Sequence, residues 1–523
     1  MRGRLKVSYT ECFNPGMRRD RAEGTLVELV LTQAHTQGDR TAILDGTQAI
    51  SYGELAESAL CVSDVLRDLG VERGDRVAIS GRNSIAWVCT AVGILCAGAI
   101  VVPIGYGVSE SEYARIVRVT RPKMIITEFT CDRNSDGPTI SEIVEAARHY
   151  TACRDHGLPD AGDTALILST SGSTGMSKQV PMTHRQLTRL YSSVAARLGM
   201  TAMDRILGVV PLAHSFGFNG VLLTAITAGA SVRLVESYDR GDLADLVIRD
   251  RVTVIMGPPT VLFDLIASGR EDVGLVCRMA VSGGSDVPLG RMRKACQELG
   301  IVSMFVGYGL TEACGTVAIG SVTEGRSGSL AMLTPIEGLE VRIVDEYGYS
   351  VPSDVDGHVI CSGYNVFTGY LEDPDTRLEH QEGREMMSPT EGDVADGWLR
   401  TGDIGWTDDE GHLYIVSRAK DTVIVSGFNV YPQEVELALL EHELVCEAIV
   451  IGVVDDRQGQ RLIACIIPVA GRSVDVDELT AFCRKRLSAY KVPKAFVELE
   501  MIPTTHAGKP SREMLREKYS DRL

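Results

Sequence analysis

Short apolar runs rich in valine and isoleucine alternate with longer amphipathic segments through the first four hundred residues of the chain. Runs of this kind predict strands that are buried on both faces. Apolar side chains recur at helical spacing in three segments, which predicts helices at 52–69, 186–198 and 243–249. The alternation indicates an α/β fold in which helices cover parallel sheets. The predicted strands are residues 77–80, 124–126, 206–210, 232–235 and 252–255.

The pattern changes after residue 338, where short strands and turns follow one another as far as about residue 370. This stretch predicts a small, barrel-like antiparallel part. A separate unit begins near Ala419, and a chain of 523 residues is long enough for two or more domains. We therefore expect a large N-terminal domain followed by a small α+β domain. The predicted elements of the small domain are helices at 433–440 and 476–487 and strands at 448–451 and 462–467.

The formal net charge of the chain is −18 at pH 7. Proteins that bind nucleic acid present basic surfaces, so we expect no nucleic-acid partner. A local pocket of lysine and arginine can still hold an anionic ligand. The 13 cysteines are scattered without a C-x-x-C pair, which is typical of reduced thiols in a cytoplasmic protein. Residues 1–24 are polar and charged, so we expect no signal peptide there.

Residues 85–105 carry no charge and are numerous enough to span a bilayer. Gly93, Gly98 and Pro103 divide this segment into a predicted helix at 85–97 and a short strand at 99–102. A helix that is apolar on every side is also typical of the core of a large α/β protein. We therefore expect a buried helix and no membrane span.

The run from Leu168 to Lys178, LSTSGSTGMSK, follows an apolar strand-like segment and combines hydroxyl groups, glycines and one ammonium group. Such a loop can present backbone N–H groups, hydroxyls and a cation to phosphate oxygens. Its spacing is not that of a Walker A loop. The alternative is a flexible surface linker, because runs of serine, glycine and threonine are common in linkers.

Further short motifs follow this loop along the chain. They are PLAHSFG from Pro211, GYGLTE from Gly307, WLRTGD from Trp398, SRAKD from Ser417, GFNVYP from Gly427 and TTHAGK from Thr504. In this order and at these spacings the motifs resemble those of the adenylate-forming superfamily: acyl-CoA synthetases, coumarate-CoA ligases, adenylation domains and beetle luciferase. The resemblance covers about residues 25–520 and is strongest toward acyl-CoA ligases.

The resemblance implies a polar tail at residues 1–24, an N-terminal AMP-binding domain at 25–419 and a mobile C-terminal lid at 420–523. It also implies ATP, Mg²⁺, CoA and a carboxylic acid. The acid would attack the α-phosphorus of ATP to give an acyl-adenylate, and the acyl group would then pass to the thiol of CoA. Two anions must meet in the first step, which requires cations and aligned hydrogen-bond donors.

By the same resemblance, Glu312 would hold Mg²⁺, a hard cation that prefers oxygen ligands, and Thr311 would donate to the α-phosphate. Without the family, Glu312 would be read as a solvated surface residue. Gly283, Gly284 and Gly309 are predicted to line the cofactor site. The loop residues predicted to hold the β- and γ-phosphates are Thr170, Ser171, Gly172, Ser173, Thr174, Gly175 and Lys178.

The nucleoside is assigned to three further residues by resemblance. Tyr308 would stack on adenine, and the alternative is a core aromatic beside a glycine turn. The Asp403 carboxylate would accept hydrogen bonds from both ribose hydroxyls, and the alternative is a turn aspartate after Gly402. Arg418 would contact ribose or phosphate, and the alternative is a surface charge.

The C-terminal residues are assigned to the two half-reactions. Lys509 would bind the substrate carboxylate and the α-phosphate and stabilise the transition state, a role that suits a point charge on a flexible stem. Lys420 matches the hinge about which the small domain rotates. Rotation would withdraw Lys509 and bring Gly427 to a tunnel for the pantetheine arm of CoA, where glycine permits a close approach.

Amino-acid-activating members of the superfamily carry an aspartate just after the segment that matches His214, and residues 215–222 here contain no acid. A buried, unpaired substrate ammonium would be costly, so we expect an uncharged, largely apolar acid. His214 is grouped with the catalytic residues as a pocket wall or gate, and the alternative is a satisfied core histidine. Plausible pocket glycines are Gly217, Gly220, Gly283, Gly284 and Gly315.

Several positions depart from the family pattern. Ser177 stands where proline is usual, Ala331 where glycine is usual, and His358 where glutamate is common. The piece at 382–395 resembles the insertion of fatty-acyl-AMP ligases, which pass the acyl group to carrier proteins. An acyl-AMP ligase, or a partner that completes one half-reaction, is therefore the alternative to an acyl-CoA ligase, and a luciferase-like oxygenase is the third reading. We expect a monomer or a homodimer.

Overall fold

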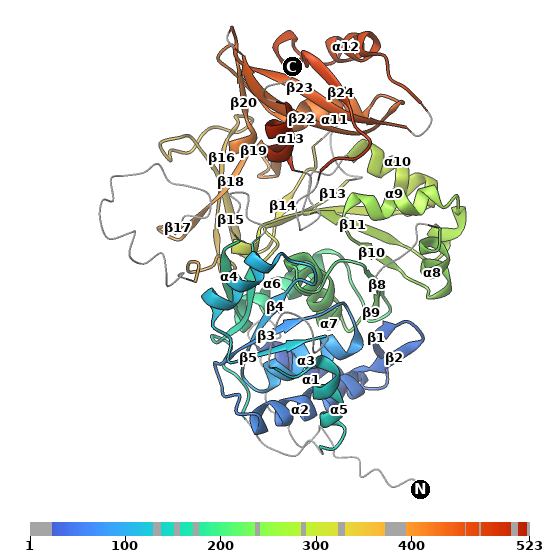
Figure 1. The fold of residues 1–523 in the computed structure, drawn as a ribbon, viewed down its shortest axis with the longest axis vertical. Coiled ribbons are helices and arrows are strands. Elements are labelled where there is room, and N and C mark those ends of the chain that lie inside the picture. Colours follow the sequence, from blue (N-terminus) through green and yellow to red (C-terminus); the bar gives the residue numbers. More distant parts are fainter. Residues whose placement is uncertain are drawn as a thin grey trace.

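The computed structural model describes residues 24–128, 137–150, 157–170, 177–235, 241–283, 289–322, 330–371, 394–455, 457–469, 472–503 and 511–519. These residues form four β-sheets with the helices that cover them (Figure 1). The α/β expectation is confirmed, since the two sheets of the first three hundred residues are mostly parallel.

The largest sheet has nine strands, and six neighbouring strands at its centre run parallel. Antiparallel strands close both edges. In spatial order the strands are β14 (Thr334–Pro335), β13 (Ala318–Ser321), β12 (Ser303–Tyr308), β11 (Met279–Gly283), β10 (Val254–Met256), β8 (Arg205–Gly208), β9 (Ser231–Leu234), β1 (Thr41–Asp45) and β2 (Gln48–Ser51).

A second, five-stranded sheet is parallel except at β7. Its strands in spatial order are β5 (Met124–Thr127), β3 (Arg76–Ser80), β4 (Ile100–Ile104), β6 (Thr164–Ser169) and β7 (Gln179–Thr183). The turn between β6 and β7 contains the hydroxyl-rich loop, so this loop leaves the sheet at the carboxyl end of a buried strand, as the sequence predicted.

Helices fill the space between the two sheets and cover their outer faces (Figure 1). One apolar core includes side chains from both sheets and from the helices between them. The inner helices are α1 (Leu26–Gln37), α2 (Tyr52–Asp68), α3 (Ile85–Cys96), α5 (Ile140–Ala147), α6 (His184–Arg197) and α7 (Thr224–Ala228). The outer helices are α4 (Glu110–Thr120) on the smaller sheet and α8 (Leu243–Arg249), α9 (Pro259–Ala267) and α10 (Leu289–Leu299) on the larger one.

The uncharged segment forms α3 and β4, as predicted. Ser84 caps the start of α3, where its side chain accepts a hydrogen bond from the Trp87 amide. Gly93 allows α3 to approach α2 closely, because a Cβ at this position would lie 2.3 Å from Val62 Cγ1. The helix is thus packed within the core. Every helix among the described residues is either too short or too polar to cross a bilayer.

The antiparallel part predicted from residue 338 to about residue 370 contributes two strands to a third sheet of five strands, which continues beyond the predicted end to residue 418. Its strands are β15 (Leu339–Val344), β16 (Gly357–Gly363), β17 (Val394–Ala395), β18 (Trp398–Thr407) and β19 (Leu413–Arg418). A short 3-10 turn (Ala419–Asp421) then leads into the small domain, so the predicted boundary at 419/420 falls within this turn. Residues 1–23 of the predicted tail lie outside the described residues.

The small C-terminal domain packs helices against its own sheet and lies beyond β11, β13 and α10 (Figure 1). A long hairpin of β22 and β23 forms its centre. Its elements are β20 (Val423–Val425), β21 (Phe428–Val430), α11 (Pro432–Leu440), β22 (Val445–Asp455), β23 (Gly459–Pro468), α12 (Val476–Arg484), β24 (Ala495–Glu498) and α13 (Arg512–Tyr519).

Candidate functional site

A cleft of about 3320 Å³ lies between the small domain and the large one. Residues that follow the carboxyl ends of β6, β8, β10, β11 and β12 line the large-domain side. Open α/β sheets bind ligands at this edge, where the chain leaves the strands and loops are free to vary. The hydroxyl-rich loop and the PLAHSFG, GYGLTE, WLRTGD and SRAKD motifs therefore contribute residues to one cleft, although they are far apart along the chain.

The ends of the hydroxyl-rich loop are held together at the cleft. The Thr170 amide donates to the Lys178 carbonyl at 2.8 Å, and the Lys178 amide donates to Thr170 Oγ1 at 3.1 Å. Lys178 Nζ lies 4.5 Å from the centre of the Tyr370 ring, a cation–π contact. The other predicted loop residues lie outside the described residues: Ser171, Gly172, Ser173, Thr174 and Gly175.

Tyr370 joins this loop to the predicted metal-binding residue. Its hydroxyl donates to Glu312 Oε1 at 2.7 Å, while its ring faces Lys178. Thr311 and Glu312 form a single 3-10 turn directly after β12, and both line the cleft. A hard carboxylate oxygen beside a lysine and several hydroxyls fits a magnesium ion bound together with phosphates. The donor chemistry therefore suits the predicted ion.

Three residues at the other end of this wall form a hydrogen-bonded group. Asp403 is buried, accepts a hydrogen bond from the Tyr308 hydroxyl at 2.5 Å, and pairs with Arg418 Nε at 2.8 Å. Desolvation raises the pKa of the Tyr308 phenol well above its ordinary value, and the Asp403 carboxylate adds to the rise. Tyr308 therefore stays protonated and remains a donor.

Two of the alternatives drawn from sequence are wrong. Asp403 is not a turn residue, because it lies within β18 and pairs in register with Arg418 of β19. Arg418 is not a solvated surface charge, because it pairs with the buried Asp403 carboxylate and its Nη1 reaches the Thr401 carbonyl at 3.3 Å. The pairing of two strands places both side chains at the cleft.

Two of the predicted cofactor glycines, Gly283 and Gly309, lie where a larger residue would clash with the backbone. A Cβ at Gly283 would lie 2.4 Å from the Gly307 carbonyl oxygen on the neighbouring strand. A Cβ at Gly309 would lie 2.4 Å from the Gly315 carbonyl oxygen. Both glycines line the cleft and bring backbone close to backbone there. Gly284 lies outside the described residues.

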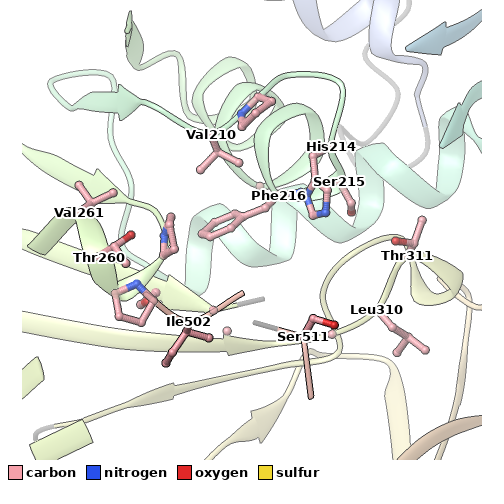
Figure 2. A pocket seen from close by; sticks show the side chains of 18 of the residues that line it. Val210, His214, Ser215, Phe216, Thr260, Val261, Leu310, Thr311, Ile502 and Ser511 are labelled. Carbon is pink, nitrogen blue, oxygen red and sulfur yellow. Dashed lines mark hydrogen bonds between the residues drawn. The ribbon is translucent and has the colours of Figure 1, made fainter. Parts of the chain in front are cut away.

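The apolar end of the cleft lies around the PLAHSFG motif. The strand β8 ends at Gly208 rather than at 210, because Asn83 Nδ2 binds the Val210 carbonyl at 2.9 Å and draws the chain out of the sheet. His214 lines the cleft, and its Nδ1 accepts the Phe216 amide at 3.2 Å. Figure 2 shows the Phe216 ring extending across the pocket toward Thr260 and Val261.

Gly217 is not a pocket residue, contrary to the sequence expectation. A Cβ there would lie 2.1 Å from the Pro211 carbonyl oxygen, so this glycine serves close packing away from the cleft lining. Gly220 and Gly315 do line the cleft, but each lies against a neighbouring side chain. The nearest atoms to a Cβ at these positions are Phe216 Cδ2 at 2.7 Å and Ser215 Oγ at 2.5 Å, respectively.

Gly315→Ala is expected to lower the free energy of unfolding by about 2–4 kcal/mol, because a positive φ and a packing clash add together. Gly315 has φ +99, and its Cβ would meet both Ser215 Oγ and Tyr191 Oη. Gly411→Ala is the matched control, since Gly411 has φ +83 and no atom within 4 Å of its Cβ position. Urea unfolding of both variants measures the difference. Equal losses would contradict the assigned contacts.

The small domain contributes the opposite wall of the cleft. Lys420 and Asp421 line it, and Asp421 pairs with Arg516 at 3.1 Å. Ile502 and Ser511 lie beside the pocket in Figure 2, on either side of the segment that contains Lys509. Lys509 itself lies outside the described residues.

Gly427 is not brought to the cleft. It forms the tip of the β20–β21 hairpin at φ +84, and no atom lies within 4 Å of its Cβ position. It is absent from the residues that line the cleft. In this arrangement the cleft contains Lys420 and the described site residues of the large domain. Gly427, the residue predicted to line the pantetheine tunnel, lies apart from them.

Two contacts of residues that line the cleft were missed by reasoning from sequence. Tyr370 contacts both Lys178 and Glu312. It has no role predicted from sequence, where residue 370 only marks the end of the predicted antiparallel part. Arg291 donates to the Cys446 carbonyl and so links α10 of the large domain to β22 of the small one. A single arginine on an amphipathic helix gives no signal of such a contact.

Two family models match the chain. Residues 30–371 match the family described as AMP-binding enzyme, and residues 434–509 match the AMP-binding enzyme C-terminal domain. The chain is 32% identical over 510 residues to a 3-[(3aS,4S,7aS)-7a-methyl-1,5-dioxo-octahydro-1H-inden-4-yl]propanoyl:CoA ligase from Mycobacterium tuberculosis, covering 92% of this chain and 96% of the relative. It is 30% identical over 492 residues to a feruloyl-CoA synthase from an Amycolatopsis species, covering 92% and 96%.

Solved structures show the same two-domain architecture. ATP-bound MatB from Rhodopseudomonas palustris superposes with a TM-score of 0.82 at 25% identity, covering 95% of this chain and 99% of that one. The o-succinylbenzoate CoA synthetase MenE from Bacillus subtilis, in complex with its acyl-adenylate intermediate, superposes with a TM-score of 0.80 at 26% identity, covering 93% and 97%.

Proposed function

The chain belongs to the AMP-binding enzyme family, and from that premise we propose that it is an AMP-forming acid–thiol ligase. It activates a carboxylic acid with ATP and transfers the acyl group to the thiol of CoA. The relatives of this chain include CoA ligases, and its structural neighbours include complexes with ATP and with an acyl-adenylate.

One observation carries the proposal: a single cleft joins polar, anion-binding groups to an apolar pocket. Lys178, Glu312, Asp403 and Arg418 line one part of it, and Phe216 and its apolar neighbours line another. A carboxylate is a poor acylating agent and must be joined to a good leaving group. The cleft suits this reaction because it can hold the triphosphate and the acid side by side.

We assign the first half-reaction to the polar wall. Lys178 and the hydroxyl-rich loop neutralise the β- and γ-phosphates, and Thr311 donates to the α-phosphate. Asp403 accepts from the ribose hydroxyls and Tyr308 lies against adenine. Glu312 would hold magnesium, which would supply charge neutralisation at the phosphates. Preorganised donors of this kind stabilise charge that develops in the transition state.

We assign the second half-reaction to a rotated small domain. The present arrangement suits the first half-reaction, because Ile502 and Ser511 face the cleft while Gly427 lies away from it. Rotation about Lys420 would exchange these two segments. Element ends commonly absorb such changes in dihedral angle, and the 3-10 turn at Ala419–Asp421 is of this type.

The substrate class follows from the pocket side chains. We propose an uncharged, largely apolar acid, because residues 215–222 supply no carboxylate for a substrate ammonium. CoA is the proposed acceptor, with an acyl carrier protein as the alternative. Of the piece at 382–395 that suggested a carrier protein, residues 382–393 lie outside the described residues. Ser177 and Ala331, which depart from the family pattern, both line the cleft.

We further propose a cytoplasmic location and a monomer or homodimer. The cysteines of the described residues are all free thiols, and free thiols persist in reducing compartments. ATP and CoA are also supplied there. Size-exclusion chromatography with light scattering measures the oligomeric state directly.

A panel of carboxylic acids, incubated with ATP and with or without CoA and analysed by mass spectrometry, tests the proposal. We expect acyl-CoA and AMP with at least one apolar acid. Acyl-AMP that persists in the presence of CoA would instead support transfer to a carrier protein. An oxidised product or light would support the luciferase-like reading. No adenylate with any acid would contradict the proposal.

A further inference from the structure

Three hydroxyl groups lie in the apolar part of the cleft. Tyr191 comes from α6, Ser215 directly precedes the π-helix at Phe216–Leu223, and Thr316 follows the turn at Gly315. We call these three residues the hydroxyl cluster, and all of them line the cleft. The cleft lining also includes Val194, Val210, Val281, Ile319 and Leu333.

Gly315 allows the hydroxyl cluster to form. A Cβ at this position would lie 2.5 Å from Ser215 Oγ and 2.9 Å from Tyr191 Oη, so both hydroxyls lie directly against the glycine. Tyr191 Oη lies 3.5 Å from Thr316 Oγ1. The Tyr191 and Ser215 oxygens therefore meet at one point of the backbone, next to Thr316, which is more than a hundred positions away from both in the sequence.

The backbone carbonyl beside this cluster already accepts two hydrogen bonds. The Cys314 carbonyl accepts both the Tyr191 hydroxyl at 2.9 Å and the Asn219 amide at 3.2 Å. Asn219 Nδ2 also lies 3.5 Å from Ser215 Oγ, toward which it can donate. A carbonyl oxygen has two lone pairs, so Cys314 has none left for Ser215 or Thr316.

Two hydroxyl protons of the cluster are thus available to a ligand. Among the described residues, no acceptor lies within hydrogen-bond distance of the Ser215 proton, and this side chain is buried. The contact from Thr316 to Tyr191 at 3.5 Å is well beyond the usual O–H···O distance of about 2.7–2.8 Å. Burial raises the pKa of the Tyr191 phenol above its ordinary value, so Tyr191 stays protonated and offers no anionic acceptor.

Building on the proposed function, we propose that the acid carries a neutral carbonyl oxygen, such as a ketone, which accepts hydrogen bonds from Ser215 and Thr316. A purely hydrocarbon acyl group would exclude water from both hydroxyls and leave them without acceptors, which is unfavourable. A charged group would fit worse, because the cluster contains no ionised side chain to pair with it.

The test compares two acids that differ only in this oxygen: cyclohexylpropanoic acid and its analogue with a ketone on the ring. A site built to bind a substrate oxygen discriminates against the analogue that lacks it. We expect kcat/KM for the ketone acid to exceed that for the parent acid by about tenfold or more, because unpaired hydroxyls oppose binding of the parent.

The double variant Ser215→Ala/Thr316→Val removes both hydroxyls with little change in volume. It is expected to bring the ratio of the two kcat/KM values close to one, mainly through a loss with the ketone acid. Thr224→Val is the matched control, because Thr224 is a buried hydroxyl at the start of α7 that does not line the cleft. The control should retain the wild-type ratio.

The inference would be overturned by a ratio near one in the wild type, by a ratio that the double variant leaves intact, or by equal losses with both acids in that variant. Failure of both probes while other acids are adenylated would overturn it too. Absence of acid-dependent pyrophosphate exchange with every acid is a different result, because it would overturn the proposed function itself.

Discussion

Lys509→Ala is expected to lower acid-dependent pyrophosphate exchange by about a thousandfold or more, which corresponds to about 4 kcal/mol of transition-state stabilisation. The lysine is assigned to the crowded centre where the carboxylate attacks the α-phosphorus, and its charge matters most in the transition state. ATP binding should change by less than about threefold, because other residues hold the triphosphate and the nucleoside. Exchange kinetics and calorimetry measure the two quantities separately.

Lys494→Ala is the matched control for this variant. Lys494 is an exposed lysine of the same domain. Its backbone amide donates a hydrogen bond to the Leu462 carbonyl at 2.9 Å, and an alanine at this position keeps that bond. It should exchange pyrophosphate at the wild-type rate. If Lys509→Ala retained exchange within about tenfold of wild type, a difference under about 1.4 kcal/mol, the assigned role would be refuted.

Lys420→Pro is expected to slow thioester formation by about a hundredfold while slowing adenylate formation less than about tenfold, because proline fixes φ near −65° and the rotation needs a second dihedral state. Lys420 lies in the 3-10 turn between β19 and β20, and the φ of about −50 to −70° that is usual in such turns is one that proline allows. Rapid-quench measurements starting from ATP and acid, or from purified acyl-AMP and CoA, separate the two steps.

Lys420→Ala distinguishes the backbone from the side chain at this hinge. Alanine removes the ammonium group but keeps φ free, so the second step should lose much less than in the proline variant. Equal losses of both half-reactions in Lys420→Pro would count against the hinge assignment. So would an alanine variant that reproduces the selective loss of thioester formation.

Local composition was sufficient to predict several elements of the fold. The uncharged run at 85–105 formed a buried helix and a strand, and the short valine-rich runs formed parallel strands. These predictions succeed because periodicity and burial act on neighbouring residues. The end of β8 was placed two residues too late, since a side chain from another part of the chain, Asn83, binds the Val210 carbonyl.

The motifs also showed which kinds of side chain form the site, but they did not show which residues these side chains contact. Asp403 was predicted as a ribose acceptor, whereas its bond to Tyr308 spans 95 positions in the sequence. Its pairing with Arg418 depends on the register of β18 and β19. Such contacts depend on strand pairing and helix packing, which no local spacing records.

The sequence by itself predicted an α/β scaffold from its alternating segments and a hydroxyl-rich loop with one cation, and its motifs resemble those of adenylate-forming enzymes. Only the tertiary structure decided which glycines line the cleft, that Tyr370 joins Lys178 to Glu312, and that Tyr191, Ser215 and Thr316 meet at Gly315. The physical reason is that composition and periodicity act between neighbours in the chain, whereas a binding site is assembled by packing between residues that are distant in it.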